Sequence, residues 1–170
     1  TGRTTKVSLG QPVVSDIFPV VISNDAPAAF PVGTTTVTWT ARDANGNVSS
    51  AVQKVTVKYG SFKILPPLST RNATTFKRGS VIPVMFGLRD TQNRKVSFAR
   101  ATLSYAKMNG GVAGAEINAA SIIPRWDNSF KYVIDQYLFT MSTAKMPAGQ
   151  YRLSIKLDDG STYYLYINLK

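Results

Sequence analysis

Residues 34–57 read TTTVTWTARDANGNVSSAVQKVTV, and this stretch decides the fold class. Residues 34–40 are β-branched and aromatic, a composition that favours a β-strand. The Asn45-Gly46 pair that follows supplies the positive φ angles of a tight hairpin turn. Apolar and polar residues then alternate from residue 48 to residue 57, as in a strand with one buried face. The stretch therefore predicts a β-hairpin in a half-buried sheet.

The same period of two recurs between residues 60 and 170. It predicts further strands at residues 80–88, 96–105, 129–140, 151–157 and 163–169. Pro83 indicates an edge position or a bulge. Residues 107–121 predict a long loop because they are rich in Gly, Ala and Asn, and Ile134 is predicted to face the same way as Phe130. Many short strands without an amphipathic helix predict an all-β fold of β-sandwiches.

The alternation breaks near Tyr59, where the sequences Tyr59-Gly60-Ser61 and Pro66-Pro67 interrupt it. We therefore expect two domains, residues 1–59 and residues 60–170. The short, proline-stiffened junction between them predicts a semi-rigid connection. A chain of 170 residues is long enough for two small domains of this kind.

The composition argues against catalysis. The chain has no cysteine and no histidine, which removes thiolate chemistry, the commonest general base and the commonest metal ligand. Asp127 and Asp135, near Trp126, Tyr132 and Tyr137, supply the ingredients of a glycosidase carboxylate pair, but nothing in their spacing requires one. No apolar run approaches the ~20 residues of a membrane-spanning helix, so membrane insertion is not expected.

Positive charge is concentrated in the second predicted domain. The chain has 20 Lys and Arg against 9 Asp and Glu, a net charge of +11. Residues 60–170 hold fifteen of the basic and six of the acidic residues, a net of +9. Such a surplus attracts polyanions. Because the basic residues are scattered, the commoner explanation is solubility with weak non-specific attraction, and the alternative is a face that binds an anionic cell-surface polysaccharide. Copies of the chain itself are the other candidate partner. Nucleic acid is not expected, since no RNA-recognition or OB-type signature is present.

The stretch from residue 30 to residue 57 resembles the C-terminal half of a hyalin repeat, or HYR domain. The residues that carry the resemblance are Phe30, Pro31, Gly33, Thr34, Thr35, Val37, Trp39, Thr40, Ala41, Asp43, Gly46 and Asn47. The resemblance implies an immunoglobulin-like sandwich with an adhesive or spacer role. A complete domain of this type would have one further strand before Thr1. We expect that a fragment boundary removes this strand or that another chain supplies it and so builds a filament.

The second predicted domain resembles a bacterial module named for a Pro-x-Lys-Phe motif and often found at the C-terminus of secreted proteins. The matching stretches are FKRGSVIPVMF at residues 76–86, PAGQYRL at 147–153 and LDDG at 157–160. Met85 stands where the module has its lysine, so no role of that lysine is carried over. Together the two resemblances imply two tandem immunoglobulin-like β-sandwich domains in a secreted or cell-surface bacterial protein, with other domains of a longer parent as partners.

Asp43, Asn45 and Asn47 have the i, i+2, i+4 spacing that begins many Ca²⁺ loops. The twelfth position of such a loop would be Lys54 rather than a bidentate acid, so the spacing favours an Asx turn and leaves Ca²⁺ as the alternative. No other cofactor is expected. Asn47 and Asn72 each begin an N-glycosylation sequon.

The last predicted hairpin supplies a candidate ligand site. Tyr164 and Tyr166 alternate with apolar residues on the final strand, and Arg152 and Lys156 occupy the matching polar face of the strand before it. Cross-strand aromatic packing is the commoner reason for such a pattern. The alternative is a basic and aromatic patch that stacks on sugars.

Three functions follow from these observations. The first is a non-catalytic structural or adhesion module, either alone or as a subunit of an extracellular assembly. The second is an accessory polysaccharide-binding module of a secreted hydrolase. The third is a strand-exchanged filament subunit.

Overall fold

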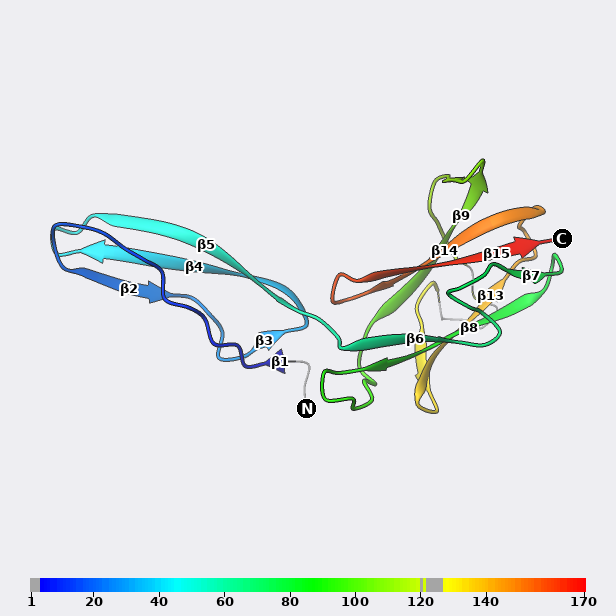
Figure 1. The fold of residues 1–170 in the computed structure, drawn as a ribbon, viewed down its shortest axis with the longest axis horizontal. Helices are drawn as coiled ribbons and strands as arrows, with labels where there is room; N and C mark the ends of the chain where they lie inside the picture. The colour runs from blue at the N-terminus through cyan, green and yellow to red at the C-terminus, as the bar shows by residue number, and fades with distance from the viewer. Residues whose placement is uncertain (1–3, 120, 122–126) are drawn as a thin grey trace. The chain divides into compact units, whose positions relative to one another are not determined.

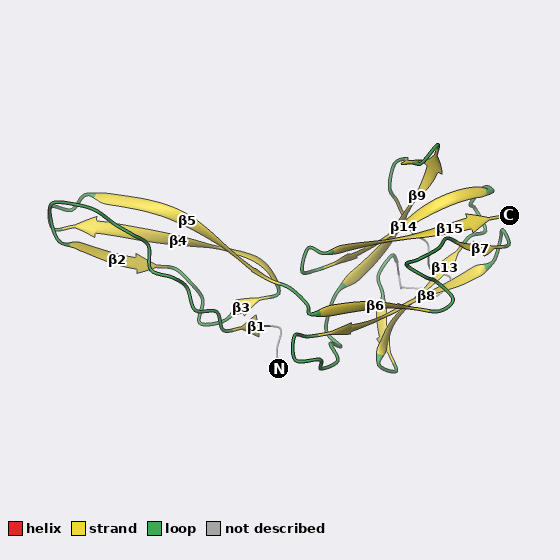
Figure 2. Ribbon diagram, in the orientation of Figure 1, coloured by secondary structure: helices red, strands yellow, loops and turns green. Residues whose placement is uncertain are grey.

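The computed structural model describes residues 4–119, 121 and 127–170. These residues form strands, turns and loops, and no helix among them is long and apolar enough to cross a membrane (Figure 2). The chain divides into two compact domains, Thr1–Lys58 and Tyr59–Lys170 (Figure 1). We call these the first and the second domain.

The first domain is built on the predicted hairpin. Its main sheet has the order β2-β4-β5, made of Val20–Asn24, Gly33–Asp43 and Val48–Val57. Within the Asn45-Gly46 pair only Gly46 takes a positive φ, 88°, so the β4–β5 turn is not the two-residue turn with two positive φ angles that the pair predicts. A two-stranded pairing of β1 (Thr4–Thr5) with β3 (Phe30–Pro31) completes the domain. Its buried apolar residues are Phe30, Val37, Trp39 and Val55.

The second domain packs two sheets around one core. One sheet has the order β12-β13-β8-β6, made of Lys131–Val133, Gln136–Ser142, Val81–Arg89 and Ser61–Leu65. The other has the order β10-β9-β14-β15-β7, made of Val112–Ala113, Ala101–Asn109, Gly149–Leu157, Thr162–Leu169 and Thr74–Phe76, with β11 (Ile117–Asn118) also paired to β9. We call this second sheet the larger sheet. Alternate residues of both sheets point inward, and they are buried along β8, β13, β14 and β15.

The topology of the second domain is immunoglobulin-like. One sheet holds β6, β8, β12 and β13 in the places of strands A, B, D and E, and the larger sheet holds β9, β14 and β15 in those of C, F and G. Tyr151, near the start of β14, donates its hydroxyl to the carbonyl of Pro147 at 2.8 Å. This bond reproduces the tyrosine corner of immunoglobulin sandwiches. The predicted fold class, all-β with two tandem immunoglobulin-like domains, is confirmed.

Four local predictions are wrong. The strand predicted at 96–105 begins only at Ala101, and the loop predicted at 107–121 contains the short strands β10 and β11. The strand predicted at 129–140 is a hairpin of β12 and β13, because Ile134 and Asp135 turn the chain with φ values of 46° and 68°. Ile134 is 89% exposed and does not face the core with Phe130.

Pro83 lies in an interior strand, yet its local setting matches the prediction of an edge. It stands opposite Thr140 of β13. On the other side of β8, strand β6 ends at Leu65, which pairs with Met85. That end of β8 is therefore paired on one side, which lets a residue without an N–H group fit.

Candidate functional site

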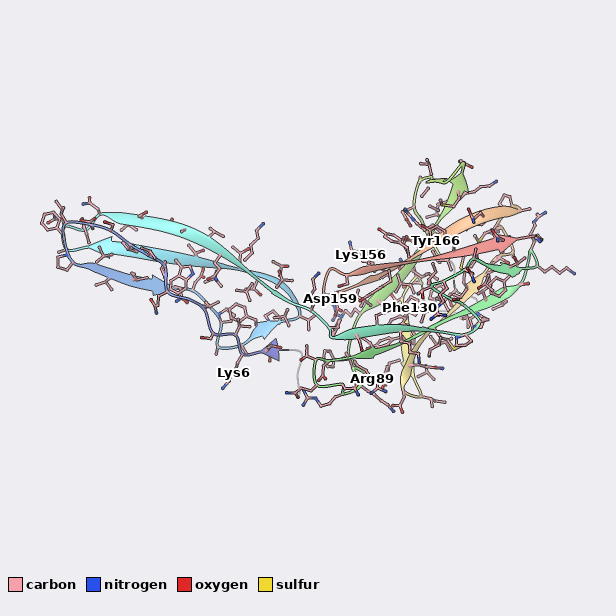
Figure 3. All side chains as sticks on the ribbon, in the orientation of Figure 1. Lys6, Arg89, Phe130, Lys156, Asp159 and Tyr166 are labelled. Atoms are coloured by element: carbon pink, nitrogen blue, oxygen red, sulfur yellow. The ribbon has the colours of Figure 1, made fainter. Side chains whose placement is uncertain are left out.

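The solvent-facing side of the larger sheet presents two tyrosines. On β15 the residues Leu165 and Ile167 are buried, whereas Tyr164 and Tyr166 are 50% and 40% exposed. Strand alternation places Arg152, Ser154 and Lys156 of β14 on the same side, because Arg152 pairs with Tyr166 and Ser154 with Tyr164. Figure 3 shows Tyr166 and Lys156 on these two neighbouring strands. The structure thus brings together all four residues of the predicted patch, which we call the tyrosine platform: Arg152, Lys156, Tyr164 and Tyr166.

Glu116 organises the centre of the platform. Its carboxylate accepts hydrogen bonds from Arg152 Nη2 at 2.7 Å, from Ser154 Oγ at 2.8 Å and from Ser104 Oγ at 2.6 Å. The guanidinium carbon of Arg152 lies 4.7 Å from the centroid of the Tyr164 ring, within cation–π range. We call Glu116, Arg152, Ser104 and Ser154 the Glu116 cluster. It holds Arg152 against Tyr164.

Glu116 is the residue of the site that the sequence did not reveal. It lies 36 positions before Arg152 in a stretch rich in Ala, Gly and Asn, where no alternation indicates its face. Partial burial alone would raise the pKa of this carboxyl. The hydrogen bonds from Ser104, Arg152 and Ser154 outweigh burial and hold the pKa below its usual range.

Acid is expected to weaken the Glu116 cluster. Since the folded-state pKa of Glu116 lies below the unfolded value, the stabilisation is complete above pH ~4.5 and is lost as the pH falls through the folded pKa. We expect Glu116→Gln to cost less than about 1 kcal/mol at pH 7, because the carboxylate is partly exposed. Denaturant unfolding of both proteins between pH 7 and pH 3 measures this cost. It should shrink below pH ~4.5, and a cost that is independent of pH would contradict the assignment.

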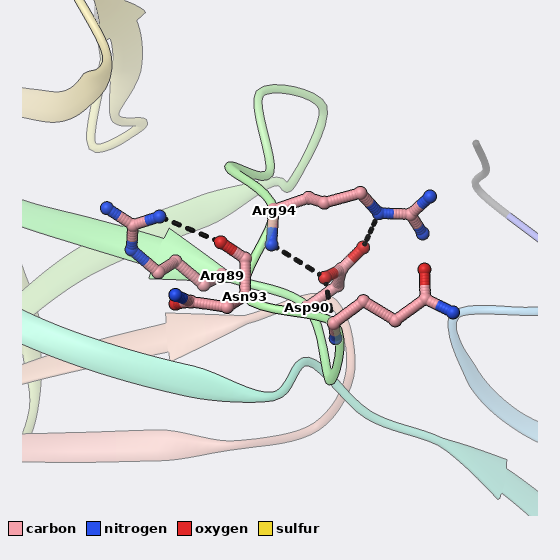
Figure 4. Close-up of polar contacts among 5 residues, drawn as sticks. Arg89, Asp90, Asn93 and Arg94 are labelled. Carbon is pink, nitrogen blue, oxygen red and sulfur yellow. Dashed lines mark hydrogen bonds and ion pairs between the residues drawn. The ribbon is translucent and has the colours of Figure 1, made fainter.

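Acidic side chains in the second domain are largely occupied by internal partners. Asp90 accepts hydrogen bonds from the backbone and the guanidinium of Arg94 (Figure 4), and Asp135 pairs with Lys95. The hydroxyl of Tyr59 donates to Asp158 at 2.9 Å, and the backbone N–H of Tyr59 donates to Asp159 at 3.0 Å. With Glu116, five of the six acids of the domain are engaged.

Basic side chains of the same domain are mostly unpaired. Ion pairs among the described residues use Arg94, Lys95 and Arg152. Eleven others form none within this part of the chain: Lys63, Arg71, Lys77, Arg78, Arg89, Arg100, Lys107, Lys131, Lys145, Lys156 and Lys170. The excess charge is therefore presented to solvent, where it attracts anions.

The candidate Ca²⁺ loop forms a self-contained turn. Asn47 donates its backbone N–H to Asp43 at 2.8 Å and its side-chain amide to the other carboxylate oxygen at 2.7 Å. The hydrogen bonds from Asn47 lower the pKa of Asp43. These bonds account for the Asx-rich sequence, and Ca²⁺ binding by Asp43, Asn45 and Asn47 stays a prediction. Asn47 and Asn72 are both exposed, as glycosylation would require.

Of the two carboxylates considered for glycosidase chemistry, Asp135 is engaged by internal partners. Asp135 accepts hydrogen bonds from Lys95 and from the Tyr132 hydroxyl. Tyr137 is buried and binds backbone groups of the 96–99 segment. Burial raises the pKa of Tyr137 to about 12. Trp126 lies outside the described residues.

Comparison with known families assigns the first domain. Residues 2–58 match the model of the HYR domain. The prediction of a hyalin-type domain is confirmed for this part of the chain, and the resemblance of the second domain to the Pro-x-Lys-Phe module stays a prediction. No curated protein matches the chain.

Several solved structures are similar to this chain at low identity. A glycosyl hydrolase family 2 member from Bacteroides cellulosilyticus is 12% identical, over 84% of this chain and 18% of the hydrolase, with a TM-score of 0.39. Domains 4 and 5 of the S-layer protein SbsC are 11% identical, over 96% of this chain and 84% of theirs, with a TM-score of 0.39. This chain thus spans less than a fifth of the hydrolase. Because both TM-scores lie below 0.5, we draw no functional conclusion from either structure.

Proposed function

We propose that this chain is a non-catalytic adhesion and spacer module of a secreted or cell-surface protein. The observation that carries the proposal is the HYR match of residues 2–58, placed in tandem with a second immunoglobulin-like domain. Each domain has its own hydrophobic core, as is typical of modules that are joined in tandem to space or present other domains. The described residues hold no group of three or more His, Cys, Asp and Glu side chains that would bind a metal.

Surface labelling tests this proposal. Antibodies raised against the purified chain are applied to intact cells that produce it and to the same cells after permeabilisation. Labelling of intact cells that disappears after brief external protease treatment is expected. Labelling that requires permeabilisation would contradict an extracellular role, and hydrolytic activity of the purified chain would contradict a non-catalytic one.

The apolar surface of the first domain favours a second role, as a subunit of an assembly. Four apolar residues are buried in its core. Eight large apolar residues are exposed: Val7, Val13, Val14, Ile17, Phe18, Val21, Val48 and Val52. A groove of about 370 Å³ lies between residues 12–16 and one end of the β2-β4-β5 sheet. Exposed apolar surface of this kind is typical of an interaction site.

Light scattering coupled to size exclusion tests self-assembly. If copies of the chain cover this surface, the mass should rise with protein concentration and persist at high salt, because apolar contacts are not screened. Val48→Asp, which places a charge on an exposed residue of β5 that lines the groove, should return the protein to a monomer. A mass equal to one chain at every concentration would exclude this second role.

A further inference from the structure

The tyrosine platform has the form of a stacking surface. Tyr164 and Tyr166 are two residues apart on β15, so their Cα atoms lie about 7 Å apart on one side of the sheet. Their exposure contrasts with Tyr163, whose ring stacks on Phe62 with a centroid distance of 3.8 Å inside the domain. The negative face of an exposed aromatic ring attracts the polarised C–H groups of a sugar ring.

The Glu116 cluster orders this surface before any ligand arrives. Arg152 is fixed by Glu116 and lies against one face of the Tyr164 ring, which orders a side chain that stays 50% exposed. A tyrosine that is already ordered loses little conformational entropy on binding. Ser104 and Ser154 are in turn bound to Glu116 and add hydroxyl groups to the centre of the same face.

Charge determines which sugars fit. The charge of Arg152 is balanced by Glu116, but Lys156 forms no ion pair among the described residues. Lys156 pairs with Thr162, two positions along the ladder from the pair of Ser154 with Tyr164 and therefore on the same side of the sheet. A cation therefore stands diagonally beside Tyr164, and ten further basic residues in the described part of this domain form no ion pair there.

We propose that the tyrosine platform binds an acidic polysaccharide: sugar rings stack on Tyr164 and Tyr166, and Lys156 receives a carboxylate of the chain. This inference rests on the proposed extracellular function, because such polymers are found on cell surfaces. Nucleic acid fits the platform less well. Proteins that bind single strands combine stacking aromatics with a positive groove along the backbone, whereas here the central arginine is neutralised and one lysine adjoins the tyrosines.

Titration calorimetry on the whole chain tests the proposal with two matched sugars. β-1,4-Linked hexamannuronate and β-1,4-mannohexaose differ only in the carboxylate or the hydroxymethyl group at C6. Hexamannuronate is expected to bind and mannohexaose to bind at least tenfold more weakly. Tyr166→Ala should weaken hexamannuronate binding about tenfold, the loss of one stacked ring.

Two lysine variants separate a local contact from general attraction. Lys156→Gln should weaken hexamannuronate binding about fivefold, close to the ~1 kcal/mol of a partly exposed ion pair. Lys63→Gln removes the same charge from β6 in the other sheet and should change binding less than twofold. Equal effects of the two variants would overturn the assignment of Lys156.

Other outcomes would overturn the proposal as a whole. They are equal binding of both sugars, tighter binding of oligo-dT than of hexamannuronate, and no binding of either sugar. None of these bears on surface labelling, so the platform can fail while the proposed adhesion and spacer function stands. Thermal unfolding of each variant confirms that these exposed substitutions leave the fold intact.

Discussion

Replacing Phe86 with alanine is expected to lower the free energy of unfolding of the second domain by ~3–5 kcal/mol. Phe86 is 0% exposed, and its ring lies 4.8 Å from Phe62, 5.0 Å from Phe130 and 4.7 Å from Tyr137 between centroids. Phe62 belongs to β6 and Tyr137 to β13, the two strands that flank β8, and Phe130 directly precedes β12. Alanine would leave a cavity bounded by rigid aromatic rings, which close around a void poorly.

Scanning calorimetry of the whole chain measures this loss, and hydrogen exchange assigns it to residues. The transition of the second domain should fall by more than ~10 °C, while the amides of β4 and β5 keep their protection. Val81→Ala is the matched control, since Val81 lies on the same strand and is 46% exposed. It should cost less than about 0.5 kcal/mol. Loss of protection in β4 and β5 with Phe86→Ala would mean that the two domains unfold as one.

Turn chemistry explains which hairpins the sequence reveals. The turns at Asn45-Gly46 and Asp159-Gly160 contain a glycine that takes the positive φ, so a short window suffices to predict them. The β12–β13 turn places Ile134 at a φ of 46°, which a β-branched residue rarely adopts. A residue from outside the hairpin contacts this turn, since Lys95 forms an ion pair with Asp135. Lys95 lies 40 positions earlier in the chain, so the sequence around the turn does not reveal this contact.

Part of the candidate site can likewise be predicted from local sequence, and part depends on tertiary contacts. Alternation shows that Tyr164 and Tyr166 share one face of β15, but both faces of that strand carry large side chains. Only packing decides which face is exposed, because Tyr163 stacks on Phe62 from the other sheet. Glu116 reaches the site through the pairing of β11 with β9, two residues long. Such a short pairing leaves no periodic signal, so the centre of the platform follows from tertiary structure alone.

Gly60→Ala is expected to destabilise the second domain by ~1–3 kcal/mol or more through a clash of backbone atoms. A Cβ at this position would lie 2.5 Å from the carbonyl carbon and oxygen of Asp90 and 2.7 Å from the nitrogen of Thr91. The backbone at Gly60 is held by hydrogen bonds that a shift would break. Gly60 donates its N–H to the carbonyl of Arg89 at 2.9 Å, and Tyr59 donates its N–H to the Asp159 carboxylate.

The opposing backbone is equally constrained, since the Asp90 carboxylate binds the N–H groups of Gln92 and Arg94 and closes its own turn. Denaturant unfolding of the whole chain measures the cost. Gly87→Ala is the matched control, because a Cβ there meets nothing within 4 Å and β8 tolerates alanine better than glycine. It should be neutral or stabilising by up to ~1 kcal/mol. If Gly60→Ala behaves like Gly87→Ala, the β6 edge adapts to the added methyl group, and the close approach of Gly60 to Asp90 is not a constraint on the fold.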